Sequence, residues 1–140
     1  MNRAEVETWL ARHRAAFDAR DADRLAAGHS EHGTFESPAA GKVSGRAAIR
    51  QVYAYWLTAF PDLEFTWDRP VIDGDRVAFF WRFRDTAQGA FFGDVKAGTR
   101  LEFSGAGQYR ISSEGIEEAR HVFDFTGALI NAGVLKVKPL

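Results

Sequence analysis

Two segments in the second half of the chain place a wholly apolar set of side chains at every second position, the period of a strand with one buried face. In RVAFFWRFR, residues 76–84, this set is Val77, Phe79, Trp81 and Phe83. In RLEFSGAGQYRI, residues 100–111, it is Leu101, Phe103, Gly105, Gly107, Tyr109 and Ile111. Glycines on one face allow a strand to bend sharply. The chain is therefore constrained to build a bent sheet whose apolar side is covered.

Helical spacing precedes these strands. Residues 4–17 and 21–28 predict one longer and one short helix, and residues 45–60 carry the clearest helical stripe. That stripe comprises Ile49, Val52, Tyr53, Trp56, Leu57 and Phe60. We expect Ser44 to cap this third helix and Pro61 to end it. Before it, residues 32–38 predict a short strand and residues 39–45 a loop.

Helices followed by an antiparallel meander are typical of the α+β class. The meander strands are predicted at residues 63–72, 76–85, 100–111 and 116–125, and residues 129–140 suggest a short helix and a tail. We predict one domain over residues 1–140. In it a curved antiparallel sheet forms a cone, and the three helices of the N-terminal half pack on its concave face.

Composition argues against several classes of function. The chain has 140 residues, no cysteine and a net charge of −1, with acidic and basic residues mixed along it. We therefore expect no nucleic-acid partner, no membrane association and no thiolate chemistry, with cytoplasmic residence as the default. Its 12 Phe, 4 Trp and 3 Tyr suit either a thick core or a pocket for flat organic molecules.

The last predicted strand holds an acid, Asp124, between two phenylalanines, and both of its faces are mixed. Ala119, His121, Phe123 and Phe125 share one parity, whereas Ile116, Arg120, Val122 and Asp124 share the other. If Asp124 faces inward, His121 lies on the outer face, where aromatic surface suggests subunit contact. A bulge would instead bring both side chains to one side. Periodicity leaves both arrangements open.

Four segments carry a family resemblance: SGRAAIRQVYAYWLTAFPDLEF, DGDRVAFFWRF, AGTRLEFSGAGQYRI and EGIEEARHVFDFTGAL. They resemble the SnoaL-like polyketide cyclases of the nuclear transport factor 2-like superfamily, over nearly the whole chain. The resemblance implies a cone-shaped α+β barrel with a deep apolar pocket, a homodimer through the sheet, and no metal or organic cofactor. It also implies that Asp124 is the general acid/base of an intramolecular aldol ring closure.

Candidate site residues follow from this resemblance and from the apolar faces. We predict Asp124 and His32 as catalytic, because burial between phenylalanines raises a carboxyl pKa toward the range for proton transfer at neutral pH. A donor such as His32, His121 or Tyr109 would hold the developing oxyanion. The predicted substrate-binding residues are Tyr53, Trp56, Trp81, Phe103, Tyr109 and His121.

Two further residues suggest metal binding only weakly. His29 and Glu36 accompany His32, and two histidines with a carboxylate are a common ligand set. Because these residues cross from a helix end into a strand, their spacing does not fix where the rings point. We predict no metal site, and a small hydrophobic or aromatic molecule as the ligand.

Three functions fit this site. The leading hypothesis is a cofactor-independent cyclase or isomerase that acts on a hydrophobic ketone or polyketide-like substrate. The first alternative is a non-catalytic module of the same fold that binds a small molecule or dimerises. The second is a hydratase or dehydratase, which needs an additional acid/base pair in the cavity.

Overall fold

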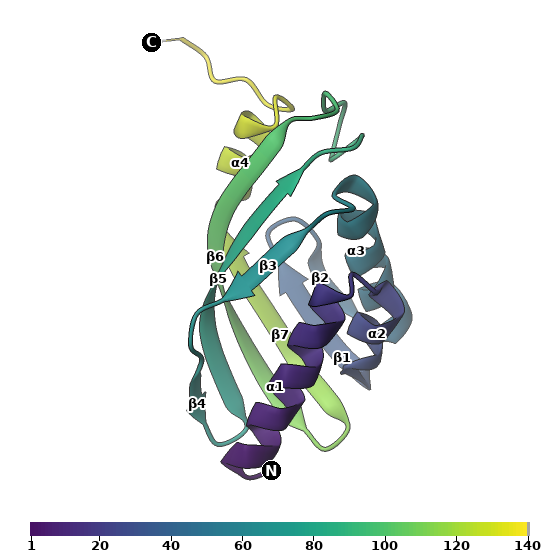
Figure 1. The fold of residues 1–140 in the computed structure, drawn as a ribbon, viewed down its shortest axis with the longest axis vertical. Coiled ribbons are helices and arrows are strands. Elements are labelled where there is room, and N and C mark those ends of the chain that lie inside the picture. Colours follow the sequence, from purple (N-terminus) through teal and green to yellow (C-terminus); the bar gives the residue numbers. More distant parts are fainter. Residues whose placement is uncertain (140) are drawn as a thin grey trace.

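The computed structural model describes residues 1–139, in which the order of elements is close to the predicted one (Figure 1). The helices are α1 (Arg3–Asp18), α2 (Ala22–Ala27), α3 (Arg46–Ala59) and α4 (Phe125–Asn131). The strands are β1 (His29–Ser37), β2 (Gly41–Ser44), β3 (Glu64–Trp67), β4 (Val71–Asp73), β5 (Arg76–Thr86), β6 (Arg100–Ser112) and β7 (Gly115–Phe123). None of the helices in residues 1–139 is long and apolar enough to cross a membrane.

The strands form one curved, open sheet in the order β2-β1-β7-β6-β5-β3, with β4 also paired to β5. Figure 1 shows α1, α2 and α3 on the concave side of this sheet, so the predicted α+β architecture is confirmed. One pair departs from the prediction, because β1 runs parallel to β7. β1 lies in the helical half of the chain, and no local pattern indicates which distant strand it joins.

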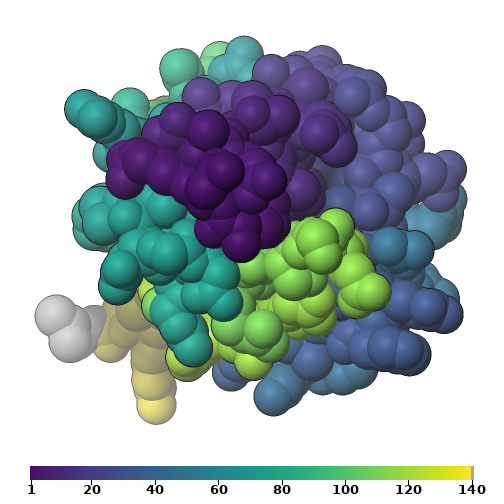
Figure 2. All heavy atoms as spheres, turned by 90° about the horizontal axis from the view of Figure 1, so that it is seen from below, coloured from purple at the N-terminus to yellow at the C-terminus, as the bar shows by residue number. Residues whose placement is uncertain are grey.

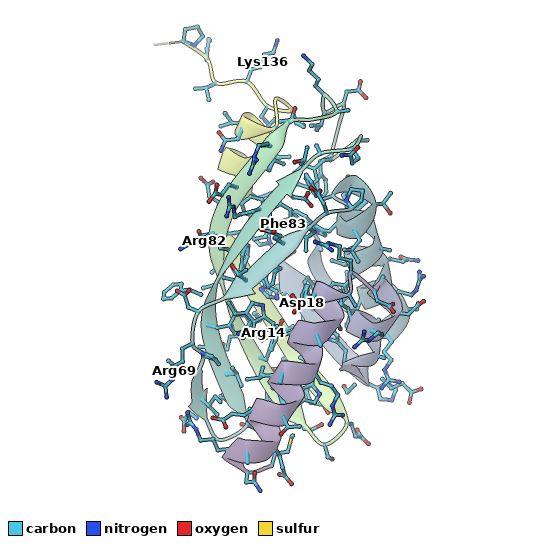
Figure 3. All side chains as sticks on the ribbon, in the orientation of Figure 1. Arg14, Asp18, Arg69, Arg82, Phe83 and Lys136 are labelled. Atoms are coloured by element: carbon cyan, nitrogen blue, oxygen red, sulfur yellow. The ribbon has the colours of Figure 1, made fainter. Side chains whose placement is uncertain are left out.

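On β5 and β6, the side chains predicted by alternation to face inward do face the helices. Val77, Phe79, Trp81 and Phe83 are buried, whereas Arg82 and Arg84 are exposed. Figure 3 shows Arg82 projecting from the convex side and Phe83 pointing toward the helices. On the outer face Arg84 Nε lies 3.9 Å from Glu102 Oε1, a cross-strand ion pair of the expected kind.

Two glycines of β6 make room for the aromatic layer. Gly105 lies opposite Trp81 and Gly107 opposite Phe79 in the β5–β6 register. A Cβ at Gly107 would stand 2.7 Å from Phe79 Cζ, and one at Gly105 would collide with the Trp81 indole. The rings of β5 therefore lie across the β6 backbone, which a larger residue would prevent.

Two local predictions are wrong. Ser44 does not cap α3, because it ends β2, and Gly45 is the N-cap without a side-chain hydrogen bond. Gly45 has φ 87°, a left-handed conformation that favours glycine where the strand turns into the helix. Residues 41–44 form β2 rather than loop, since they pair antiparallel with residues 34–37 of β1. Four residues are too few for alternation to reveal a strand.

Helix α1 closes one end of the curved sheet. Asn2 and Glu5 form a capping box at its start, and Val6, Leu10, His13 and Phe17 are buried on its inner face. Seen from below, α1 lies against the β4–β5 end and the β6–β7 turn (Figure 2). The interior is thus enclosed by α1 at one end, with α3 along its side.

Candidate functional site

The interior holds a cavity of about 80 Å³ between α3 and the inner face of the sheet, here named the inner cavity. Its wall is almost wholly apolar. The residues on it that carry polar side-chain atoms are Ser37, Tyr53, Trp56, Trp81 and His121. Carboxylates do not occur on this wall, and the buried carboxylate Asp85 of β5 lies outside it.

Five predicted binding residues lie on the wall of the inner cavity: Tyr53, Trp56, Trp81, Phe103 and His121. The stripe of α3 supplies two of them, and the inward faces of β5, β6 and β7 supply the others. The face of His121 was left open by the sequence, and contact of all five residues with a substrate stays a prediction.

Tyr109 is fully buried but does not line the inner cavity. It belongs to a group beneath α1 that also contains His13, His29 and Trp67, here named the α1 cluster. The His13 ring is centred 5.9 Å from Tyr109, 5.8 Å from His29 and 6.3 Å from Trp67. Each member has at least one enclosed polar atom with no hydrogen-bond partner among residues 1–139.

His32 lies away from the cavity, contrary to the prediction. It is exposed, as is Glu31, whereas His29 and Ser30 are buried. The β1–β7 pairing shifts register between His29 and Thr34, so inward and outward positions do not alternate regularly there. A change of parity in mid-strand cannot be read from residue spacing.

Asp124 is exposed, so the expectation of a buried acid is also wrong. β7 ends at Phe123, and Asp124 is the N-cap of α4. Its Oδ1 accepts a hydrogen bond of 2.9 Å from the Gly127 backbone N–H. The alternation of the strand therefore ends before Asp124, and the Asp124 side chain caps the first turn of α4. A role for it in catalysis stays a prediction.

His121 faces inward without a bulge beside it. It pairs with Gly107 in the β6–β7 register, and the shift in that ladder lies at Arg110 and Ile111. Ala119 and His121 are buried while Val122 is exposed, which selects one of the two arrangements that periodicity leaves open.

Trp81 fixes the protonation pattern of His121. The Trp81 indole N–H donates to His121 Nδ1 over 3.1 Å. Burial lowers the pKa of His121 to about 4, so the ring is neutral near pH 7. Because Nδ1 accepts a hydrogen bond, the ring proton lies on Nε2. Nε2 is not among the enclosed atoms that lack a partner, so it is open to the cavity as a donor.

His29 is a second interior histidine, and sequence reasoning missed it as a site residue. Its Nε2 lies 2.7 Å from the Tyr53 hydroxyl. Burial, together with His121 and Arg46, lowers the pKa of His29 to about 3, and burial raises the pKa of Tyr53. The helical stripe identified Tyr53, but no sequence signal shows that β1 brings His29 to it.

The polar groups facing the inner cavity are therefore neutral hydrogen-bonding groups rather than charges. His121 offers an N–H, and Tyr53, on the same wall, has its hydroxyl hydrogen-bonded to the neutral imidazole of His29. In residues 1–139, no three His, Cys, Asp or Glu side chains gather closely enough to hold a metal ion. Such a site suits an uncharged molecule with a carbonyl or hydroxyl oxygen, surrounded by aromatic rings.

Fold and site together show helices packed on a curved sheet around an apolar cavity. The family model of the SnoaL-like polyketide cyclases matches residues 7–130, and the chain belongs to that family. No curated protein matches the chain significantly.

Solved structures agree with this assignment. AclR of Streptomyces galilaeus, a proposed hydroxylase, is 25% identical with a TM-score of 0.82, covering 99% of this chain and 91% of its own. A proposed SnoaL-like polyketide cyclase from Jannaschia sp. is 17% identical with a TM-score of 0.77, covering 97% and 99%. A Catenulispora acidiphila protein with a ketosteroid isomerase-like fold, in complex with trimethylamine, is 19% identical with a TM-score of 0.76, covering 94% and 97%.

Proposed function

We propose that the protein is a cofactor-independent cyclase or isomerase that binds a hydrophobic ketone in the inner cavity. The observation that carries this proposal is His121, a neutral imidazole held in one tautomer by Trp81 and open to an apolar cavity. A substrate carbonyl oxygen accepts the hydrogen bond from Nε2–H. As a proton leaves the neighbouring carbon, negative charge grows on that oxygen and the bond strengthens.

The departing proton needs an acceptor, and we assign this role to the Tyr53–His29 pair, because Tyr53 lies on the cavity wall and its hydroxyl bonds His29. Tyr53 takes the substrate proton as its own hydroxyl proton passes to His29 Nε2. Because the pKa of His29 is about 3, this relay is a weak base. We therefore expect a substrate whose acidic C–H lies between two carbonyl groups and which delocalises its own enolate charge.

The test is enolisation of benzoylacetone, an aromatic β-diketone, followed by the change in enol absorbance. We expect the wild-type protein to accelerate it and His121→Phe to lower the catalysed rate by about 10²-fold, the size of effect seen when one oxyanion donor is lost. His121→Gln restores an N–H and should recover part of the rate. A wild-type rate no faster than that of free imidazole would contradict the proposal.

One observation favours a second candidate, a non-catalytic module that binds the same ligand. Carboxylates do not line the inner cavity, so the acid/base that the family resemblance implies is not within it. This candidate expects saturable binding of benzoylacetone with no rate enhancement. A hydratase is not favoured, because His32 and Asp124 both lie on the surface.

We also propose that the convex sheet face binds a second copy of the chain. Phe80 and Val122 are 69% and 62% exposed. In the strand register Ala106 lies between them, so the three form an apolar row across β5, β6 and β7. Light scattering after gel filtration should give a dimer for the wild type and a monomer for Phe80→Glu. A wild-type monomer would contradict this assembly.

A further inference from the structure

The inner cavity is too small for the ligand that the proposed function requires. Its volume of about 80 Å³ holds two or three water molecules at roughly 30 Å³ each. Sites for organic ligands usually measure about 300–1,000 Å³. A polycyclic or extended ketone can therefore place only its reacting end there, and the remainder needs another compartment.

A second hollow lies on the other side of α3. This outer groove has a volume of about 260 Å³ and is formed by α3, the β1–β2 hairpin and Phe92 from the loop after β5. Its wall is mainly apolar, with the Gln51 amide, the Tyr55 hydroxyl and the Trp56 indole N–H as polar groups of its residues. The outer groove and the inner cavity together reach the lower end of the range for organic ligands.

Val52 and Trp56 line both hollows, so they form the partition between them. On the inner side the Trp56 ring is centred 6.3 Å from Phe103 and 6.1 Å from Phe123, and on the outer side 6.5 Å from Phe92. These contacts are looser than the stack of Phe83 on Phe103, at 4.6 Å. The indole also stacks on Phe60 at 6.0 Å and is centred 4.9 Å from Phe91. A movement of Trp56 therefore exchanges its contacts with Phe92, Phe103 and Phe123 for contacts with a ligand.

The outer wall of the groove is held by one hydrogen bond. The Phe92 backbone N–H donates to the Tyr55 hydroxyl over 2.7 Å, and the two rings are centred 4.9 Å apart. Phe92 has φ 54°, a left-handed conformation that is unusual for a bulky side chain. Such strain persists where surrounding contacts impose it and is found at ligand clamps. Both rings are partly exposed, at 41% each.

From this arrangement we infer that the outer groove is the second compartment of one ligand site and that the Trp56 side chain moves to join it to the inner cavity. The ketone end of the ligand lies at His121, and its apolar remainder extends past Val52 and Trp56 into the groove beside Ala48. The site thus selects elongated aromatic ketones over compact ones. This inference rests on the proposed function, since it takes His121 as the group that binds the carbonyl oxygen.

The test uses prodan, a fluorescent naphthyl ketone that is too large for the inner cavity alone and whose emission shifts to the blue in apolar surroundings. Ala48 lines the groove but not the inner cavity, and its neighbour Ala47 is exposed and lines neither. Ala48→Trp fills the groove, and Ala47→Trp is the matched control. Gln51→Trp is a second groove-filling variant at an exposed position, in case Ala48→Trp does not fold.

We expect wild type and Ala47→Trp to bind prodan equally, and Ala48→Trp and Gln51→Trp to bind about tenfold more weakly, since overfilling a packed site costs about that much. His121→Phe should weaken binding by about threefold to tenfold through the lost hydrogen bond. If the groove-filling variants and His121→Phe all bind prodan more weakly, one ligand spans both compartments. Such a ligand requires Trp56 to move.

The outcomes separate the two proposals. If His121→Phe weakens binding while the groove-filling variants match Ala47→Trp, the two-compartment site is wrong and the proposed role of His121 stands. If the groove-filling variants weaken binding but His121→Phe does not, prodan lies in the groove alone. This overturns the joined site, and the role of His121 is then decided by the effect of His121→Phe on benzoylacetone enolisation. A wild-type protein that does not bind prodan overturns the joined site directly.

Discussion

The inner cavity and the α1 cluster are neighbouring parts of one interior, and they differ in how polar groups are satisfied. Around the cavity, Trp81 donates to His121 and Tyr53 bonds His29. Beneath α1, His13, Trp67 and Tyr109 have enclosed polar atoms with no partner among residues 1–139. A buried polar group without a hydrogen bond costs about 1–3 kcal/mol. The paired groups around the cavity therefore have fixed orientations, whereas the unpaired atoms of the α1 cluster, which include Nδ1 of His29, cost stability.

The largest expected effect is the pH dependence of the free energy of unfolding, which arises from three buried histidines. His13, His29 and His121 all have a pKa lowered by burial, so the folded state keeps them neutral. Below pH 6.5 the unfolded chain binds protons that the folded chain does not, so this stability is present above pH 6.5 and lost as the pH falls. Between pH 7 and pH 5, His29 and His121 each account for a loss of about 2 kcal/mol, and His13 adds to that loss.

Urea denaturation at both pH values measures this loss, of which His29 and His121 together should account for about 4 kcal/mol. Replacing exposed His32 by Ala should leave the pH dependence as it is in the wild type. His13→Phe should reduce the pH dependence, because His13 is one of the three buried histidines. Equal stability at pH 7 and pH 5 would mean that the buried histidines take up protons in the folded state.

A tyrosine-to-phenylalanine substitution can be made in both regions, at Tyr53 on the wall of the inner cavity and at Tyr109 in the α1 cluster. Tyr53→Phe leaves the buried His29 Nε2 without its 2.7 Å partner and should cost about 1–3 kcal/mol. Tyr109→Phe removes a hydroxyl that has no partner among the described residues, so it should be neutral or stabilising. Urea midpoints of the two variants provide the measurement, and equal losses would show that the Tyr109 hydroxyl is satisfied.

Trp81 on the wall of the inner cavity and Trp67 in the α1 cluster allow a second matched pair of substitutions. Trp81→Phe removes the donor that fixes the His121 tautomer, while Trp67→Phe removes an unpartnered indole N–H. Both lose similar volume, and Trp67 also loses the Arg14 guanidinium 5.2 Å above its ring, a contact worth about 0.5 kcal/mol when exposed. We expect Trp81→Phe to be about 1 kcal/mol more destabilising. Nitrogen NMR of the imidazoles should show mixed tautomers of His121 in this variant alone.

The sequence predicts best where one strand face is wholly buried. Alternation placed Trp81 and Phe103 on the cavity wall, and the α3 stripe placed Tyr53 and Trp56 there, because each pattern reports burial of its own element. His29 escaped this reasoning, since its burial depends on the parallel pairing of β1 with β7, far along the chain. Pairing between distant strands has no local signature.

The junction between β7 and α4 shows a second limit of prediction from sequence. The positions of His121 and Asp124 were ambiguous because both were assigned to one strand, whereas β7 ends between them. The N-cap signature of an acid three residues before Gly127 is short, and the phenylalanines on either side of Asp124 extend the apparent strand through it. Where a strand passes directly into a helix, parity arguments fail at the junction.

The smallest expected effects concern Asp124, and they decide between a cap and a catalyst. Asparagine caps helices about as well as aspartate, and alanine does not. Asp124→Asn should therefore match the wild type in stability, and Asp124→Ala should lose about 1 kcal/mol. Both should keep the rate of benzoylacetone enolisation, since the carboxylate bonds Gly127 at the surface rather than lining the cavity.

If Asp124 were instead the general acid/base, Asp124→Asn would lower that rate by about 10² or more at unchanged stability. Such a result would require α4 to open and turn the carboxylate inward, and would move the proton acceptor from the Tyr53–His29 pair to Asp124.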